Sequence, residues 1–227
     1  MGSPVLHSSA VSALDIQDVR VPPHALPGTL RMPRNAFGLA IFAHGSGSSR
    51  LSPRNTMVAE ALNRRGLATL LFDLLTPGEE AANSRAKVFD IPLLAARVAA
   101  AVRWVDQASV LRNAPIGLFG ASTGAAAALV AAAELGDRIG AVVSRGGRPD
   151  LAGAALGNVH APTLLIVGGA DHGVIELNEA AYARLAGPKT LAIVPDATHL
   201  FSEPGALEQV VALAGAWFEH HLRARNG

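Results

Sequence analysis

Short apolar runs recur along the chain, and most of them are apolar at nearly every position. They stand at Gly38–Ala43, Leu67–Phe72, Pro115–Phe119, Ile139–Ser144, Thr163–Val167 and Thr190–Val194. A strand that helices cover on both faces has this pattern, because neither of its sides meets water. We therefore predict a parallel strand at each of these runs.

The pattern differs near the N-terminus, where apolar and polar positions alternate from Asp15 to Val21. A second segment, Thr29–Met32, follows the proline-rich stretch from Pro22 to Gly28. Alternation is typical of an antiparallel strand with one solvated face, and proline and glycine favour a turn between two such strands. The sequence predicts an antiparallel hairpin ahead of the parallel strands.

Between the apolar runs, apolar residues recur at helical spacing. One predicted helix starts at Ser52-Pro53 and stops at Gly66, and a second starts at Asp90. Three further helices are predicted at Ala125–Leu135, Ile175–Ala186 and Ala206–Leu222. The segment Asp73–Phe89 is predicted to be a connecting loop. Strands that alternate with helices imply a mostly parallel, twisted sheet of about eight strands with helices on both faces and no large lid domain. In such a sheet the functional site lies at the carboxyl ends of the strands.

One predicted strand-to-helix connection contains the pattern Gly-x-Ser-x-Gly, formed by Gly120, Ser122 and Gly124. Glycines at these two positions let the strand and the helix approach closely, because neither carries a Cβ atom. Ser122 would then stand at the tip of a sharp turn with strained backbone angles and an exposed hydroxyl. Such a turn would be the nucleophile elbow of a serine hydrolase, provided that the rest of the chain supplies a base and an acid.

Two other interpretations of the same stretch remain open at this point. Ser122 is also a suitable N-cap, whose hydroxyl accepts a hydrogen bond from the first turn of the following helix. Alternatively, Gly117-x-x-Gly120-x-x-x-Gly124 resembles the phosphate loop of a dinucleotide-binding oxidoreductase, with Arg145 after the next strand as the partner of a 2′-phosphate.

Composition narrows the class of protein. At 227 residues and 50% hydrophobic content, the chain is long enough for one sizeable core, so we expect a single domain over residues 1–227 with residues 1–14 loosely ordered. Nineteen basic residues against 18 acidic ones leave a net charge of +1, which predicts neither nucleic acid nor a membrane surface as a partner. The absence of cysteine excludes disulfides, thiolate metal sites and a cysteine nucleophile.

No metal and no cofactor are expected, because the chain has neither His-x-x-x-His nor a cluster of carboxylates. The stretch Gly45-Ser46-Gly47-Ser48-Ser49-Arg50 lacks the Gly-Lys-Ser/Thr of a P-loop. Because no signal peptide and no apolar run of about 18 residues is found, we expect a cytoplasmic protein. The oligomeric state is left open.

A serine hydroxyl is a poor nucleophile at neutral pH and needs a base, which in turn needs an acid to orient it. The chain offers Ser122, Asp171 and His199 in this order, each directly after a predicted strand. The carboxyl ends of parallel strands meet at one edge of a sheet, so we expect the three side chains there. The order Ser, Asp, His is that of the α/β-hydrolases.

Each assignment has an ordinary alternative. Asp171 is also a candidate N-cap of the following helix, and Asp150 is the main alternative acid. We expect His172 to point away from its neighbour Asp171 and His44 to hold its own loop in place. Arg50 is a candidate for an anionic substrate group, but such an arginine more often pairs with a carboxylate.

The chain resembles the α/β-hydrolases, in particular the small dienelactone-hydrolase-like branch. The resemblance runs from about Ala40 to the C-terminus and rests on the motifs His-Gly, Gly-Ala-Ser-Thr-Gly, Gly-Gly-x-Asp and Thr-His. Dienelactone hydrolases themselves use a cysteine nucleophile, which this chain lacks. Their own activity is therefore not implied.

The resemblance implies roles for these residues. His199 takes the proton of Ser122, Asp171 orients the imidazole, and the oxyanion is bound by the backbone N–H groups of Thr123 and Ser46. We predict a serine hydrolase that cleaves small or short-acyl carboxylic esters through an acyl-enzyme. Its expected partner is therefore a small-molecule substrate.

The sequence also suggests which residues line the substrate pocket, and it leaves several alternative functions open. The candidate lining residues are Leu74, Leu75, Leu151 and Phe201, and the candidate covers are Asp73–Phe89 and Arg145–Ala161. Thioester or lactone hydrolysis and acyl transfer on the same triad are alternatives, because they need only a different pocket. Two alternatives belong to other functional classes. The first is a hydrolase-like protein that binds a partner without catalysis, and the less favoured one is the dinucleotide-binding oxidoreductase.

Overall fold

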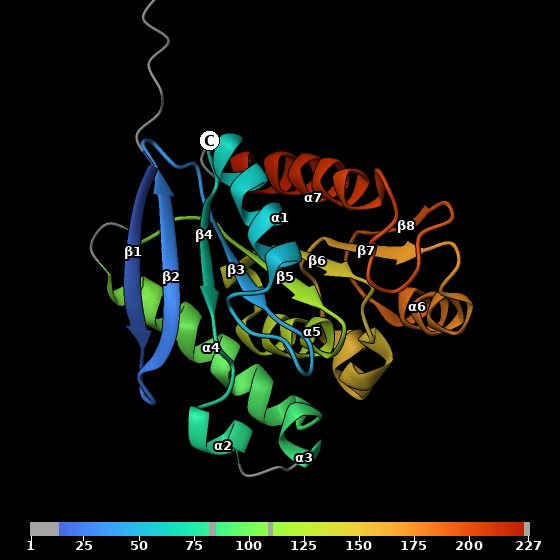
Figure 1. Ribbon diagram of the computed structural model, residues 1–227, viewed down its shortest axis with the longest axis horizontal. Helices are drawn as coiled ribbons and strands as arrows, with labels where there is room; N and C mark the ends of the chain where they lie inside the picture. The colour runs from blue at the N-terminus through green and yellow to red at the C-terminus, as the bar shows by residue number, and fades with distance from the viewer. Residues whose placement is uncertain (1–13, 82–84, 109–110, 225–227) are drawn as a thin grey trace, which may run out of the picture.

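One sheet of eight strands runs through the protein, of which a computed structural model describes residues 14–81, 85–108 and 111–224 (Figure 1). The strands are β1 (Leu14–Val21), β2 (Leu26–Pro33), β3 (Leu39–Ala43), β4 (Ala68–Phe72), β5 (Ile116–Ala121), β6 (Ile139–Arg145), β7 (Thr163–Gly168) and β8 (Lys189–Val194). Their order in the sheet is β1-β2-β4-β3-β5-β6-β7-β8. β2 pairs antiparallel with both β1 and β4, and every other neighbouring pair is parallel. The predicted antiparallel hairpin and mostly parallel sheet are confirmed, but β1 differs from a strand with one buried face, because Leu14 and Ile16 are exposed as well as its polar residues.

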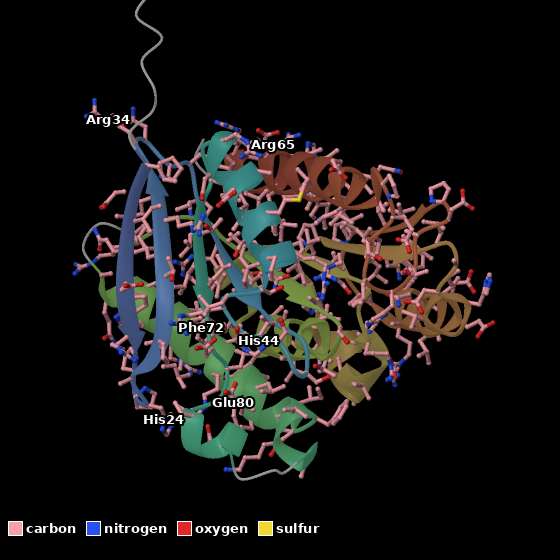
Figure 2. The ribbon with its side chains drawn as sticks, in the orientation of Figure 1. His24, Arg34, His44, Arg65, Phe72 and Glu80 are labelled. Atoms are coloured by element: carbon pink, nitrogen blue, oxygen red, sulfur yellow. The ribbon has the colours of Figure 1, made fainter. Side chains whose placement is uncertain are left out.

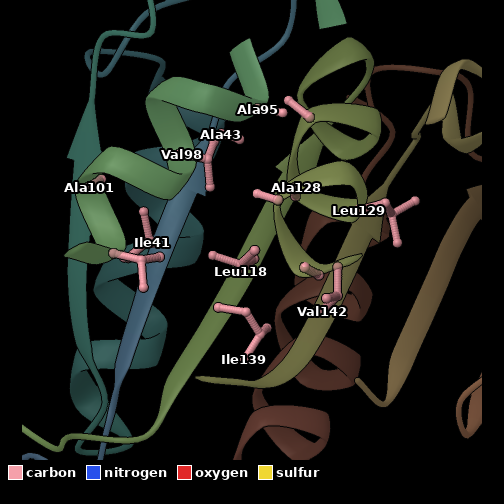
Figure 3. Close-up of a cluster of buried hydrophobic side chains, with 14 of the residues drawn as sticks. Ile41, Ala43, Ala95, Val98, Ala101, Leu118, Ala128, Leu129, Ile139 and Val142 are labelled. Carbon is pink, nitrogen blue, oxygen red and sulfur yellow. The ribbon is translucent and has the colours of Figure 1, made fainter. Parts of the chain in front are cut away.

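Helices cover both faces of the sheet (Figure 1). They are α1 (Pro53–Arg64), α2 (Pro77–Ala81), α3 (Arg85–Val88), α4 (Ile91–Gln107), α5 (Thr123–Leu135), α6 (His172–Arg184) and α7 (Ala206–Arg223), with the 3₁₀ helices η1 (Gly136–Arg138) and η2 (Pro149–Asn158). α1 and α7 bury their apolar sides on one face, while α4 and α5 do so on the other. Figure 3 shows Ile41, Leu118 and Val142 of the central strands on the face that α4 and α5 cover.

The segment 73–89 differs from the predicted loop, because it contains the short helices α2 and α3. The signal for α2 is a capping box that the sequence analysis missed. The N–H of Glu79 donates to the Thr76 hydroxyl at 3.2 Å, and the N–H of Thr76 donates to the Glu79 carboxylate at 2.8 Å. Pro77 at the first helical position and acidic residues in the first turn also favour a helix start.

The predicted loosely ordered segment 1–14 lies outside the described residues, except for Leu14 at the start of β1. Among the described residues, no helix is both long and apolar enough to cross a membrane. In the same part of the chain, no group of three or more histidine, aspartate or glutamate side chains is arranged to hold a metal ion.

The direction of the chain across the sheet reverses at β3, which lies between β4 and β5. The chain leaves β3 toward α1 on one face, and it leaves β5 toward α5 on the opposite face. The loops after these two neighbouring strands therefore diverge. Such a divergence at the carboxyl ends of parallel strands is where open α/β sheets bind their ligands.

Candidate active site

Ser122 stands in a strained turn between β5 and α5. Its φ and ψ are 51° and −124°, a conformation that side chains other than glycine rarely adopt. Its hydroxyl makes no capping hydrogen bond to α5, so the interpretation of Ser122 as an N-cap does not describe this structure. The predicted strain of the elbow is confirmed.

Gly120 and Gly124 of the elbow lie so close to neighbouring backbone that a side chain at either position would clash with it. A Cβ on Gly120 would lie 2.4 Å from Cα of Ala125, and one on Gly124 would lie 2.1 Å from the carbonyl oxygen of Ala43. Both contacts are with backbone, which cannot move aside as a flexible side chain does. The predicted close approach of strand and helix is thus present at both positions.

The loops after β7 and β8 bring Asp171 and His199 together. Nδ1 of His199 lies 2.7 Å from Oδ2 of Asp171, while the Asp171 carboxylate makes no capping hydrogen bond to α6. Nδ1 must carry the proton in this contact, because an ionised carboxylate only accepts. Nε2 of His199 is then left as an acceptor when the imidazole is neutral.

The Gly168-Gly169 pair explains how these two loops fit side by side. A Cβ on Gly168 would lie 2.2 Å from the carbonyl oxygen of Ala197. The N–H of Gly169 donates to the Val194 carbonyl at 2.8 Å, and the N–H of Ala170 donates to the Ala197 carbonyl at 2.9 Å. The glycines of Gly-Gly-x-Asp therefore permit a backbone contact that places the carboxylate beside the histidine.

The end of β6 links the serine to the histidine. The N–H of Ser122 donates to the Arg145 carbonyl at 3.4 Å. The next residue, Gly146, would place a Cβ 2.9 Å from the carbonyl oxygen of His199 and 3.7 Å from its Nδ1. The elbow and the histidine loop thus contact the same short segment from two sides.

The rival residues have other partners. The Asp150 carboxylate accepts two hydrogen bonds of 2.8 Å from the Arg148 guanidinium. Arg50 pairs with Asp73 at 2.6 Å, as an arginine in a loop was expected to do. His172 is exposed at the start of α6. Among the described residues, no side-chain hydrogen bond or ion pair joins any of them to Asp171 or His199.

His44 holds the loop after β3, as the sequence analysis expected. The side chain is buried, with 7% of its surface exposed. Its Nδ1 lies 3.0 Å from the Gly45 carbonyl, and its Nε2 accepts a hydrogen bond of 3.0 Å from the N–H of Leu74. This pair of contacts requires the neutral ring with the proton on Nδ1.

Burial makes the protein's stability depend on the charge of His44. Desolvation lowers the pKa of His44 below its usual 6.5, and this effect outweighs the hydrogen bond to the Gly45 carbonyl. The unfolded chain therefore binds the proton more readily than the folded protein does. The free energy that His44 contributes is fully present above about pH 6.5 and is lost as the pH falls toward the lowered pKa.

We expect His44→Gln to remove this part of the pH dependence, because glutamine can accept from the N–H of Leu74 and does not titrate. The measurement is the free energy of unfolding in urea between about pH 8 and pH 5, for the variant and the parent. His221, whose pKa is also lowered by burial, is unchanged in both proteins. Equal losses of stability at low pH in the two proteins would contradict the assignment of this pH dependence to His44.

The loop after β3 lies directly against the elbow. A Cβ on Gly45 would lie 2.9 Å from Cβ of Ser122. The N–H of Ser46 donates to the Thr123 hydroxyl at 3.0 Å, and Thr123 is buried. No sequence signal pointed to this hydrogen bond, which occupies one of the two N–H groups expected at the oxyanion. The N–H of Thr123 is at the first position of α5, where helices leave it without an intrahelical acceptor.

A cavity of about 660 Å³ opens beside the loop after β3. Figure 2 shows two residues of its wall, His44 at the end of β3 and Glu80 on α2. Its lining consists of residues 44–49 and 51–54 together with Leu74, Leu75, Glu80, Val88 and Leu94. The segment 73–89 thus borders the cavity, whereas 145–161 contributes nothing to this lining.

The four predicted lining residues fall into two groups. Leu74 and Leu75 line the cavity. Phe201 is buried in the core between the sheet and α7, and Leu151 packs against the core on the opposite face. Contact of Leu151 or Phe201 with a substrate stays a prediction.

Comparison with known proteins gives a family and several relatives. The model of the dienelactone hydrolase family matches residues 54–220. A crystal structure of a dienelactone hydrolase from Anabaena variabilis is 54% identical, covers 93% of this chain and 99% of its own, and superposes with a TM-score of 0.88. Est1E from Butyrivibrio proteoclasticus is 17% identical over 91% of this chain and 98% of its own, with a TM-score of 0.73, and shares the fold.

The curated relatives are longer. A protein of Mycobacterium tuberculosis that carries the name of a phosphoribosyl transferase is 58% identical over 200 residues, which are 88% of this chain and 45% of that protein. The chain therefore spans about half the length of the curated relatives that it matches.

Proposed function

Because the chain belongs to the dienelactone hydrolase family, we propose that it is a serine hydrolase that cleaves small or short-acyl carboxylic esters. The observation that carries the proposal is the 2.7 Å contact between His199 Nδ1 and Asp171 Oδ2, beside a strained turn with Ser122 at its tip. The contact leaves Nε2 of His199 as the base. The Ser122 hydroxyl has no hydrogen-bond partner among the described residues, as is common in unliganded enzymes, where catalytic hydrogen bonds tighten only with substrate.

The proposed reaction has two halves. The Ser122 oxygen attacks the ester carbonyl while Nε2 of His199 takes its proton, and the resulting intermediate expels the alcohol, which receives that proton. Water then attacks the acyl-enzyme, His199 takes a proton from the water, and the acid leaves as the Ser122 oxygen regains the proton. Asp171 keeps the proton on Nδ1 and stabilises the imidazolium in both halves.

The oxyanion is proposed to bind the N–H groups of Thr123 and Ser46. Since the N–H of Ser46 donates to the Thr123 hydroxyl at 3.0 Å, the substrate oxygen must replace this hydroxyl as acceptor. The exchange costs little, because one acceptor oxygen substitutes for another. The charged oxyanion is the stronger acceptor, so the exchange favours the transition state over the bound ester.

The same residues also support related reactions. Thioester and lactone hydrolysis use the same two halves, and acyl transfer replaces the water by another nucleophile. The transferase name of the Mycobacterium tuberculosis relatives belongs to proteins about twice as long as the matched region, and we do not extend it to this chain. The cavity of about 660 Å³ is within the range of small-molecule sites and suits each of these substrates.

We expect a fluorophosphonate probe to label the protein at Ser122, because the probe reacts only with a serine that a neighbouring base activates. The measurement is mass spectrometric mapping of the labelled peptide. Labelling should disappear in His199→Ala, where Ser122 is unchanged but lacks its base. A label on another residue, or on Ser122 in both proteins, would overturn the proposed nucleophile and base.

A further inference from the structure

Arg54 lines the cavity and has no carboxylate partner among the described residues. It lies in the first turn of α1 and forms part of the cavity wall. Its Nε is buried and has no hydrogen-bond acceptor, and the structure records no ion pair for it within residues 14–81, 85–108 and 111–224. The neighbouring Arg50, by contrast, pairs with Asp73 at 2.6 Å. The side chain is only partly buried, and none of its nitrogens donates to an acceptor among the described residues, so its guanidinium can pair with an anionic ligand in the cavity.

A buried arginine contacts the same helical turn. Arg145 is 6% exposed, its Nε has no acceptor among the described residues, and its NH2 group donates to Oδ1 of Asn55 in the first turn of α1 at 3.1 Å. The dinucleotide alternative required Arg145 at a 2′-phosphate, but the guanidinium points at α1 and lies 5.8 Å from the ring of Phe201.

The two arginines are close enough to repel each other. Burial and the charge of Arg54 lower the pKa of Arg145 to about 10, so it remains charged at neutral pH. No described carboxylate forms an ion pair with either guanidinium. Both positive charges therefore lack an ion-pair partner among the described residues at the start of α1, where the helix dipole adds further positive potential. Glu80 is the carboxylate that also lines the cavity.

The backbone beside Arg54 offers additional donors. Gly47 has a φ of 68° and open space around its Cα. The N–H groups of Gly47 and Ser49 donate to no acceptor within the described residues, whereas the N–H of Ser48 bonds to the Gly45 carbonyl. All three residues line the cavity. A glycine-rich loop that leads into a helix N-terminus is a favourable environment for an anion.

We propose that this end of the cavity is a phosphate-binding subsite, in which Arg54 pairs with the phosphate and the N–H groups of Gly47 and Ser49 donate to its oxygens. A phosphomonoester carries a charge of about −1.5 to −2 at neutral pH, roughly twice that of a carboxylate, so it gains more from Arg54 and from the positive potential of the nearby Arg145, which does not itself line the cavity. Leu74, Leu75 and Val88 give the cavity an apolar wall for the remainder of the ligand.

The subsite adjoins the elbow, because Gly45, another residue of the cavity lining, would place a Cβ 2.9 Å from Cβ of Ser122. A substrate with both an ester and a phosphate group would therefore reach the nucleophile while Arg54 holds its anionic end. This statement about the substrate rests on the proposed function. Binding of phosphate does not, since it requires no reaction at Ser122.

The test is calorimetric titration with phenyl phosphate and with benzoate, which share the ring and differ in the anion. We expect phenyl phosphate to bind the parent protein and the Ser122→Ala variant equally, and Arg54→Met to weaken its binding by about 10- to 100-fold, the effect of one charged hydrogen bond. Arg54→Lys should recover part of the affinity. Arg64→Met is the matched control, because Arg64 is exposed at the other end of α1 and the change in charge is the same.

Three results would overturn the subsite. These are a parent protein that does not bind phenyl phosphate, an Arg54→Met variant that binds as tightly as Arg64→Met, and equal affinity for benzoate, which would indicate a carboxylate site. If Arg54→Met does not fold, the proposal is tested by NMR, from the backbone amide signals of Gly47 and Ser49 in the parent protein. Phenyl phosphate should shift both signals, and unchanged signals would refute the proposal. Loss of ester turnover in Ser122→Ala, tested separately, concerns the proposed function alone.

Discussion

Ser122→Ala is expected to lower kcat for p-nitrophenyl acetate and p-nitrophenyl butyrate by a factor on the order of 10⁴ or more. The variant loses the oxygen that forms the acyl-enzyme, and only the oxyanion donors and substrate binding then remain to assist a direct attack by water. KM should change little, because the hydroxyl contributes to the transition state more than to the bound ester. Steady-state kinetics of the purified variant and parent measure both quantities.

Ser144→Ala is the matched control. Ser144 lies in the neighbouring strand β6, is completely buried, and its hydroxyl has no hydrogen-bond partner in the part of the chain that the structure describes. Removal of such a hydroxyl should leave turnover unchanged and raise the stability slightly, since an unsatisfied buried polar group is lost. Turnover that survives in Ser122→Ala, or that is lost equally in both variants, would contradict the assignment of the nucleophile.

Asp171→Asn is expected to reduce kcat by on the order of 10⁴-fold, as neutralisation of the acid does in other serine hydrolases. An asparagine amide would favour the His199 tautomer that carries the proton on Nε2, and that tautomer cannot accept the proton of Ser122. The 2.7 Å contact that orients the ring would persist in altered form, so the loss should appear in kcat and leave the fold intact. Kinetics, together with the thermal unfolding temperature, separate these effects.

Asp150→Asn provides the comparison for the alternative acid. Its carboxylate is held by Arg148, and this interaction raises the pKa of Arg148. We expect turnover within a few-fold of the parent, because the substitution weakens a partly exposed ion pair that contributes little to stability. If Asp150→Asn and not Asp171→Asn abolished turnover, the role of the acid would pass to Asp150.

The arrangement of strands and helices was predictable because it depends on patterns that are local in the chain. The alternation near Asp15 and the apolar runs correctly indicated an antiparallel hairpin and parallel strands. The largest difference lay between Asp73 and Phe89, where α2 and α3 form. The capping box of Thr76 and Glu79 is also local, so the sequence contains the signal for the start of α2.

The candidate triad was also predictable, because three residue types of matching chemistry each follow a strand. Spacing could not distinguish Asp171 from Asp150, since both stand after strands that end at the same edge. The distinction depends on the close backbone contact at Gly168, which brings the Asp171 loop against the loop of His199, and on Arg148, which engages Asp150. These are contacts between segments far apart in the chain.

The sequence by itself determined the class of fold, the strained Gly-x-Ser-x-Gly turn and the set of candidate side chains, because hydrophobic periodicity and glycine positions act over short stretches of chain. Only the tertiary structure decided which of these side chains meet. It directed the N–H of Ser46 to the Thr123 hydroxyl and gave Arg50 a carboxylate, while Arg54 has none among the described residues. Hydrogen bonds and ion pairs depend on distances of a few ångströms between loops, and those distances follow from the packing of the whole sheet and its helices.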